Sequence, residues 1–231
     1  NVISTPQTIT QPLDYTFGFQ ATPVKPMAPD VWDYRISHAG NYDLATRVHA
    51  SATSIAYPAK GNLDPRQGTF ECWVRPRFDP YPDFDPKDPG RGALNRNLFD
   101  LELGGGAHVG FYWNIDDRGM RLYFKQGEAY PLLISSHPRW KQGEWHHVAF
   151  TWGEAGRIYI DGVKAAEKSF AGLPAGDVDK ATISLGLARS DMDIDEVRIS
   201  SVARESFDLT QPPVVDAQTL LLDRLDEARQ V

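Results

Sequence analysis

Short segments in which apolar and polar side chains alternate, separated by turn residues, are the feature that most constrains this fold. In residues 70–74 (Phe-Glu-Cys-Trp-Val), the first, third and fifth side chains share one face of a strand, and the other two share the opposite face. Further strands are expected at 109–115, 121–125, 145–152, 157–160, 181–187 and 194–200. These strands recur about every 10–15 residues, and no body segment has a helical period. The sequence therefore predicts an all-β chain, an antiparallel two-sheet sandwich or jelly roll.

Turn residues predict two hairpins within this body. Asp116-Asp-Arg-Gly119 lies between the segments 109–115 and 121–125 and has the composition of a tight turn. Asp161-Gly162 follows the segment 157–160 and is a strong two-residue hairpin signal, because the favoured turn needs positive φ at its central positions.

The composition divides the chain into three zones. Residues 1–30 are predicted to be an extended N-terminal arm, because their five prolines forbid a helix. Within this arm, Tyr15–Phe19 alternates and favours one strand. Residues 31–210 form the body. Residues 211–231 open with Pro212-Pro213 and end as a charged, leucine-rich tail.

Charge and cysteine content exclude several classes of function. The chain has 24 Lys and Arg against 31 Asp and Glu, a net charge of −7, which argues against nucleic acid and against an anionic membrane surface as partners. No run of 18 apolar residues is present, so no membrane insertion is expected. Cys72 is the only cysteine, which excludes an internal disulfide. The chain starts at Asn1 rather than Met, so either a targeting segment has been removed or the chain has been cut for expression.

Three ordered segments resemble one family. They are residues 63–76, residues 143–152 with Gly-Arg-Ile-Tyr-Ile-Asp-Gly at 156–162, and residues 183–186 followed by Ile-Asp-Glu-Val-Arg-Ile at 194–199. Together they are similar to the laminin-G-like, concanavalin A-like jelly-roll superfamily over residues 31–210. The resemblance implies a jelly-roll β-sandwich and a location outside the cell. It does not fix the activity, since the family includes glycan-binding modules, adhesion domains and accessory domains of polysaccharide-degrading enzymes.

The tail resembles the opening strand of such domains, although it stands at the C-terminus. Three interpretations stay open for residues 216–227. The tail forms an amphipathic helix with Leu221, Leu225 and Ala228 on one face, or it begins a following repeat, or it completes a jelly roll. In the last case the jelly roll is its own, by permutation, or that of a neighbouring subunit, by strand donation. Strand donation predicts self-assembly through the terminal segments.

Residues 191–196 form the densest acidic cluster. Retaining glycosidases of this fold use an E-x-D-x-x-E strand motif, and the glutamates that it needs are missing here, so we expect no catalysis. The resemblance implies instead that Asp195 ligates a structural Ca²⁺. Asp226 would be a second ligand if the tail occupies the first-strand position. The alternative is that Asp195 caps a turn.

Other candidate residues for chemistry have simpler explanations. The loop from Arg77 to Arg96 carries four aspartates that suit a hard cation or frame a ligand, but it also reads as a solvated edge loop. His146 and His147 are adjacent and point to opposite faces of a strand, so they do not share an ion, and His146 is expected in the core. No zinc motif, nucleophile elbow or phosphate loop is present.

Aromatic side chains provide the remaining lead, because flat rings stack on the apolar faces of sugars. If Phe70, Phe111 and Leu122 face the core, alternation brings a set of aromatic and polar side chains to the outer face of one sheet. The predicted glycan-binding residues are Tyr112, Asn114, Arg121, Tyr123 and Trp73, framed by Tyr81, Phe84 and Trp140. The alternative for Trp73 is burial in the core.

The sequence therefore favours a non-catalytic extracellular module that binds a polysaccharide or another glycan, or that mediates adhesion. Two other functions remain open. One is a structural subunit of a surface assembly joined through residues 1–30 and 211–231, and the other is an enzyme or accessory domain acting on polysaccharide.

Overall fold

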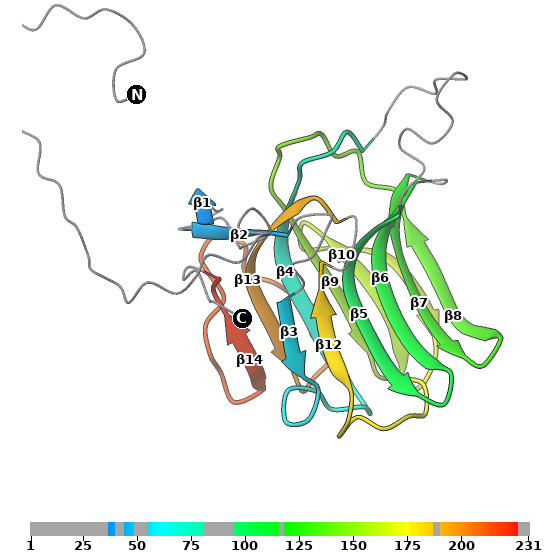
Figure 1. Ribbon diagram of the computed structural model, residues 1–231. Helices are drawn as coiled ribbons and strands as arrows, with labels where there is room; N and C mark the ends of the chain where they lie inside the picture. Colours follow the sequence, from blue (N-terminus) through cyan, green and yellow to red (C-terminus); the bar gives the residue numbers. More distant parts are fainter. Residues whose placement is uncertain are drawn as a thin grey trace, which may run out of the picture. The chain divides into compact units, whose positions relative to one another are not determined.

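Figure 1 shows the computed structural model of the chain, in which the body is built from two β-sheets. The structure describes residues 55–80, 95–115, 118–186 and 190–225, together with the backbone of 37–39 and 44–48. The predicted arm, its strand at 15–19, and the framing residues Tyr81 and Phe84 lie outside these ranges. None of the described residues belongs to a helix long and apolar enough to cross a membrane.

The larger sheet has eight antiparallel strands. They follow the order β1-β2-β13-β4-β9-β10-β11, and β14 also pairs with β13. The strands are β1 (Ser37–Ala39), β2 (Leu44–Val48), β4 (Gly68–Pro76), β9 (His146–Trp152), β10 (Ala155–Ile160), β11 (Val163–Ser169), β13 (Met192–Ser200) and β14 (Thr219–Asp223).

The smaller sheet has six antiparallel strands in the order β3-β12-β5-β6-β7-β8. They are β3 (Ile55–Pro58), β5 (Arg96–Gly104), β6 (Ala107–Asn114), β7 (Gly119–Gln126), β8 (Ala129–Ser136) and β12 (Thr182–Leu185). The described residues contain no helix. The predicted all-β, two-sheet jelly-roll sandwich is thus confirmed.

Four phenylalanine rings join the two sheets at the centre of the core. Phe70 and Phe150 come from the larger sheet, and Phe99 and Phe111 come from the smaller one. Ring centroids of Phe70 and Phe99 are 4.9 Å apart, those of Phe99 and Phe150 are 5.0 Å apart, and those of Phe111 and Phe150 are 5.2 Å apart. All four side chains are at most 1% exposed, so each contributes the full burial of an aromatic ring. Cys72 is also fully buried, as its alternation predicts.

Both predicted hairpins are present. β6 pairs with β7 from Ala107↔Gln126 to Asn114↔Gly119. β10 pairs with β11 across Asp161 and Gly162, whose φ angles are 48° and 76°. Two successive positive φ values define the turn type that matches the twist of the flanking strands, and an Asp-Gly pair adopts them at little cost.

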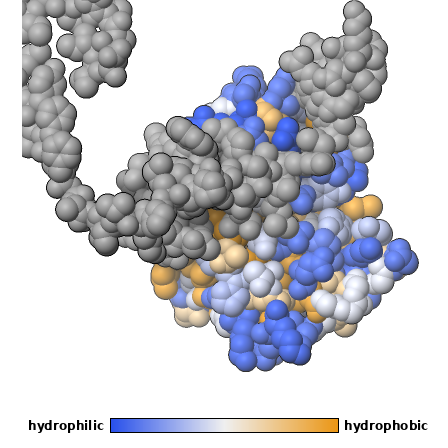
Figure 2. Space-filling view, in the orientation of Figure 1, coloured by the Kyte–Doolittle hydropathy of each residue, from blue (hydrophilic) through white to orange (hydrophobic). Residues whose placement is uncertain are grey.

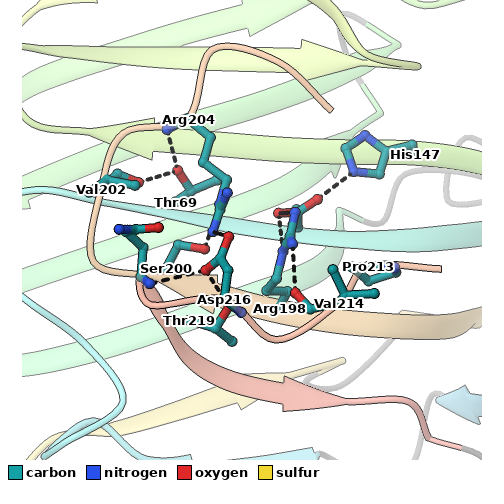
Figure 3. Close-up of polar contacts among 12 residues, drawn as sticks. Thr69, His147, Arg198, Ser200, Val202, Arg204, Pro213, Val214, Asp216 and Thr219 are labelled. Carbon is teal, nitrogen blue, oxygen red and sulfur yellow. Dashed lines mark hydrogen bonds and ion pairs between the residues drawn. The ribbon is translucent and has the colours of Figure 1, made fainter. Parts of the chain in front are cut away.

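Residues 201–218, which we term the strap, follow β13 and cover the outer face of the larger sheet (Figure 3). The ring of Phe207 lies 4.9 Å from that of His147 on β9 and 5.1 Å from that of Tyr159 on β10. The backbone N–H of Arg204 donates to the Thr69 hydroxyl on β4 at 2.8 Å. The strap therefore shields three neighbouring strands from solvent.

The strap leads into β14, which pairs with β13 of the same chain. Residues 219–223 oppose residues 197–200 of β13, while β2 pairs with the other end of that edge, residues 192–194. The helix interpretation of this segment is wrong, and here the strand is added in cis.

An ion pair joins the two ends of the strap. Burial opposes the ionised form of Asp216, but Arg204 at 2.6 Å and the Thr219 hydroxyl lower the pKa of Asp216 to about 2. Self-assembly through the tail stays a prediction.

Candidate functional site

The outer face of the smaller sheet carries the candidate site, on the β6–β7 hairpin. Phe111 and Leu122 are fully buried and point into the core. Their neighbours Tyr112, Arg121 and Tyr123 therefore project from the opposite face of the sheet. Tyr112 and Arg121 are direct register partners, so their side chains leave the sheet side by side.

These side chains line one pocket of about 320 Å³. Its wall is formed by Asn95, Asn97, Tyr112, Arg121, Tyr123, Tyr130 and Leu133. Asn95 comes directly before β5, and the other six residues come from the four strands β5 to β8. Figure 2 shows that the surface over these strands mixes hydrophilic and hydrophobic residues. A surface of this kind fits a ligand that has apolar patches and many hydroxyls, as a sugar has.

Three tyrosine rings form the apolar part of the pocket. The centroids of Tyr112 and Tyr123 are 5.8 Å apart, and those of Tyr123 and Tyr130 are 5.7 Å apart, each pair edge to face. Edge-to-face pairs of this kind fix ring orientation. Tyr130 is 52% exposed and Leu133 is 45% exposed, so apolar surface is available to a ligand at the β8 side of the pocket.

Amides and a guanidinium form the polar part. Asn97 lies opposite Tyr112 in the register of β5 and β6. The carboxamide oxygen of Asn95 accepts a hydrogen bond from the Asn114 amide at 3.1 Å, and Arg121 Nε donates to the Ser135 hydroxyl at 3.3 Å. Within the described part of the chain, the lining contains no carboxylate.

A hydrogen-bonded chain continues from the pocket along the sheet. The Tyr123 hydroxyl lies over the His108 ring, 3.1 Å from Nδ1 and 3.5 Å from Nε2, and His108 Nε2 lies 2.7 Å from Asp100 Oδ1. The hydrogen bond that the Asp100 carboxylate accepts from His108 raises the pKa of His108 above its ordinary value. Burial raises the pKa of the Tyr123 phenol, so this side chain keeps its proton at any physiological pH.

Gly110 determines where the Tyr123 ring lies. A Cβ atom at this position would sit 2.3 Å from the Tyr123 ring and 2.6 Å from its hydroxyl oxygen. Gly110→Ala is expected to displace the ring, to lower the free energy of unfolding by about 1–3 kcal/mol, and to weaken any ligand that contacts Tyr123. Urea denaturation checks the first effect. If stability and the His108–Tyr123 contact were both unchanged, this account of Gly110 would be wrong.

Sequence reasoning placed Trp73 in the same set, and this was wrong. Trp73 lies on β4 of the larger sheet, where it pairs with Asp195 and with His147. Its ring packs edge-on against that of His147 at 5.7 Å. Alternation assigned its face correctly, but that face belongs to the other sheet.

Two further residues also differ from the prediction. Asn114 is 2% exposed and donates a hydrogen bond to Asn95, so it positions a lining residue without being part of the lining. Trp140 is 2% exposed and does not frame the pocket. Its ring stacks on those of Trp113 at 5.2 Å and His146 at 4.7 Å.

His146 has only a small exposed fraction, 13% of its side chain, as expected of a core-facing histidine. Its Nδ1 lies 3.0 Å from an Asp161 carboxylate oxygen.

Four lining residues were missed: Asn95, Asn97, Tyr130 and Leu133. The segment 130–135 gives no clean alternation, because Leu132, Leu133 and Ile134 are all apolar although only Leu132 and Ile134 are buried. Asn97 follows the long acidic loop, and nothing in its local sequence marks it as part of a strand.

The outer face of the larger sheet holds a buried polar cluster (Figure 3). Arg198 Nε donates to Glu71 Oε1 at 2.7 Å, and His147 Nε2 lies 3.1 Å from Glu71 Oε2. Burial opposes ionisation of Glu71, yet these two partners hold its pKa below the ordinary value. Arg198 also donates to the Val214 carbonyl at 3.2 Å, which ties the strap to the cluster. The strap and this cluster thus occupy the face opposite the pocket.

The acidic side chains on β13 are buried in the fold. Asp193 is fully buried, and its Oδ2 lies 2.6 Å from Nε of Arg75 and 2.6 Å from Nε of Arg77. Asp195 is 1% exposed, and the described residues contain no group of three or more His, Cys, Asp or Glu that would hold a metal ion. Ca²⁺ takes six to eight oxygens, so Asp195 would need further oxygen ligands to hold it. Asp226 lies outside the described residues, so the calcium site stays a prediction.

The arrangement described above is that of a concanavalin A-like jelly roll with an aromatic pocket on one sheet. A family model described as concanavalin A-like lectin/glucanases superfamily, Laminin_G_3, matches residues 49–209. The chain belongs to this superfamily, as the resemblance at 31–210 indicates. No curated protein matches.

Solved structures show the same fold at low sequence identity. Domain 4 of the extracellular arabinanase AbnA from Geobacillus stearothermophilus, solved with arabinotriose, is 18% identical, with a TM-score of 0.51 over 73% of this chain and 76% of that chain. The binding domain of Paraclostridial Mosquitocidal Protein 1 is 15% identical, with a TM-score of 0.54 over 74% of this chain and 43% of that chain. The botulinum neurotoxin type G receptor-binding domain is 11% identical, with a TM-score of 0.52 over 74% and 41%.

Proposed function

We propose that this chain is a non-catalytic glycan-binding module that acts outside the cell, and that the pocket on β5 to β8 is its binding site. The observation that carries the proposal is the lining itself, in which three tyrosines, two asparagines and Arg121 face one hollow. Tyrosine rings offer apolar faces to sugar C–H groups, while amides and a guanidinium bind sugar hydroxyls.

Two further points support binding as the function rather than catalysis. Glycoside hydrolysis needs a pair of carboxyl groups on either side of the scissile bond, and the described lining has none. The AbnA domain, which has the same fold, was solved with a bound oligosaccharide. The family resemblance supports the placement outside the cell and the role in adhesion as further parts of this proposal.

A glycan array, run with and without Ca²⁺, tests the proposal. For the glycan that binds best, Tyr112→Ala and Tyr130→Ala are each expected to weaken binding about five- to thirtyfold, because each removes a ring worth about 1–2 kcal/mol. The melting temperature should change little for Tyr130→Ala, since this ring is half exposed. Isothermal titration measures the affinity.

Val163→Ala is the matched control, because Val163 is 68% exposed and lies on β11 of the other sheet. It should leave affinity unchanged. If Tyr112→Ala and Tyr130→Ala both bound like the wild type, the pocket would not be the binding site.

A further inference from the structure

Arg121 contributes a positive charge to the pocket wall. The other lining residues, among those that the structure describes, are asparagines, tyrosines and a leucine. Arg121 is partly buried, and its Nε donates to the Ser135 hydroxyl on β8 at 3.3 Å, which restrains the plane of the guanidinium. A guanidinium held in one plane presents a flat fork of N–H donors, and this fork matches the two oxygens of a carboxylate.

The register of the sheet gives the row of side chains to which Arg121 belongs. Arg121 lies opposite Tyr112 on β6 and Ser135 on β8, and Tyr112 in turn lies opposite Asn97 on β5. Side chains that are directly opposite each other are neighbours, with Cβ atoms about 4.5–5.5 Å apart. The three register neighbours in this row are uncharged, so the row carries a net positive charge.

The acidic side chains of β5 lie in other rows of the same face. Glu102 lies opposite His108, which lies opposite Lys125, so a cation on β7 matches the charge of Glu102 within one row. Asp100 is held by His108 Nε2 at 2.7 Å, and its strand is two strands away from β7. Two strand spacings are about 10 Å, which exceeds the Debye length of about 8 Å at physiological salt. The positive potential at Arg121 is therefore local to its own row.

The position of Arg121 beside Tyr112 suits the shape of an acidic sugar. In a uronic acid the carboxylate is bonded directly to the sugar ring. A carboxylate on Arg121 therefore brings the apolar C–H face of the same sugar toward the neighbouring Tyr112 ring. The amide of Asn97, which is the next residue in the row, both donates to and accepts from sugar hydroxyls.

We propose that the pocket selects acidic saccharides, with the carboxylate of a uronic acid on Arg121 and the ring of the same sugar on Tyr112. This inference rests on the proposed glycan-binding function and names the class of glycan. The net charge of the chain, −7, opposes an anionic ligand at long range. The preference consequently depends on the short-range contact with Arg121, and a change at this one residue should remove it.

A glycan array tests the proposal if it carries neutral glycans together with oligomers of galacturonic, glucuronic and mannuronic acid, each beside its methyl ester. The ester keeps the ring and the hydroxyls but has no charge. At least one acid is expected to bind about ten- to a hundredfold more tightly than its ester, the worth of charge-assisted hydrogen bonds. This comparison uses the wild-type chain, so it does not depend on the folding of a variant. Isothermal titration then measures the affinities of the best pair.

Variants of Arg121 identify the group that is responsible. Arg121→Gln should remove the difference between acid and ester, and Arg121→Lys should keep part of it, because lysine retains the charge without the fork. Arg139→Gln is the matched control, since it changes the net charge by the same amount at an exposed arginine outside the lining, and it should keep the difference.

The outcomes separate this inference from the proposed function. If esters or neutral glycans bound as well as the acids and Tyr112→Ala weakened them, the proposed function would stand and the selection of acidic saccharides would be wrong. A preference for acids that persisted in Arg121→Gln would also overturn the inference. If no glycan bound, acidic or neutral, both the proposed function and this inference would fail.

Discussion

Arg198→Met is expected to lower the free energy of unfolding by about 3–5 kcal/mol, the usual cost of removing one partner from a buried ion pair. The Glu71 side chain is only 5% exposed, and both of its oxygens are engaged in the wild type, one by Arg198 and one by His147. Methionine fills similar volume but leaves a buried carboxylate without its guanidinium. The variant also loses the hydrogen bond to the Val214 carbonyl that holds the strap. Guanidinium denaturation followed by tryptophan fluorescence measures the change.

Two companion variants make this prediction specific. Arg66→Ala removes an ion pair with Asp64 whose arginine is 85% exposed, and it should cost far less than Arg198→Met, because solvent screens an exposed pair. Adding Glu71→Gln to Arg198→Met should recover part of the loss, because the amide carries no charge to bury. A loss below that of Arg66→Ala would show that the cluster does not hold the strap in place.

The fold was predictable because its signals are local. Residues 70–74 alternate within five positions, and Asp161-Gly162 defines a turn within two. Phe70 and Phe150 lie on the apolar faces of their strands, and these faces form the core. These short-range patterns predict a sandwich built from hairpins, although they do not give the order of the strands in each sheet.

The candidate site was predictable only where its residues share one hairpin. Tyr112, Arg121 and Tyr123 lie on β6 and β7, whose register follows from a turn of a few residues. Trp73 failed for a different reason. Alternation gives the face of a strand but not its sheet. β4 lies between β13 and β9, and its paired residues there lie 116–131 and 72–84 positions away along the chain.

The strap had no sequence signal. Its residues have no strand period, and its hold on the sheet depends on single contacts such as Phe207 over His147 and Arg204 at Thr69. Each contact joins residues that are distant along the chain, so spacing carries no information on it. The strap nevertheless covers the outer face of the larger sheet with residues of the same chain.

The tail offers the largest expected effect on stability. A truncation that removes residues 214–231 eliminates β14 and exposes the β13 edge at residues 197–200. It also removes Leu225, which is 2% exposed, and the ion pair between Arg224 and the buried carboxylate of Glu196 at 2.9 Å. The hydrogen bond from the Tyr57 hydroxyl to Asp223, at 2.9 Å, joins the tail to the smaller sheet and is lost as well.

Together these losses are expected to exceed about 5 kcal/mol, which is comparable with the whole stability of a domain. The truncated chain should therefore show no cooperative thermal transition, while Leu225→Ala alone should cost about 2–5 kcal/mol and still fold. Scanning calorimetry at several protein concentrations distinguishes the two origins of β14. A strand added in cis gives a midpoint independent of concentration for the full chain, whereas a strand donated by a second copy gives a midpoint that rises with concentration and a larger particle on a sizing column. If the truncated chain kept the wild-type midpoint, β14 would contribute little to the fold, and the tail would be free for the assembly role that the sequence left open.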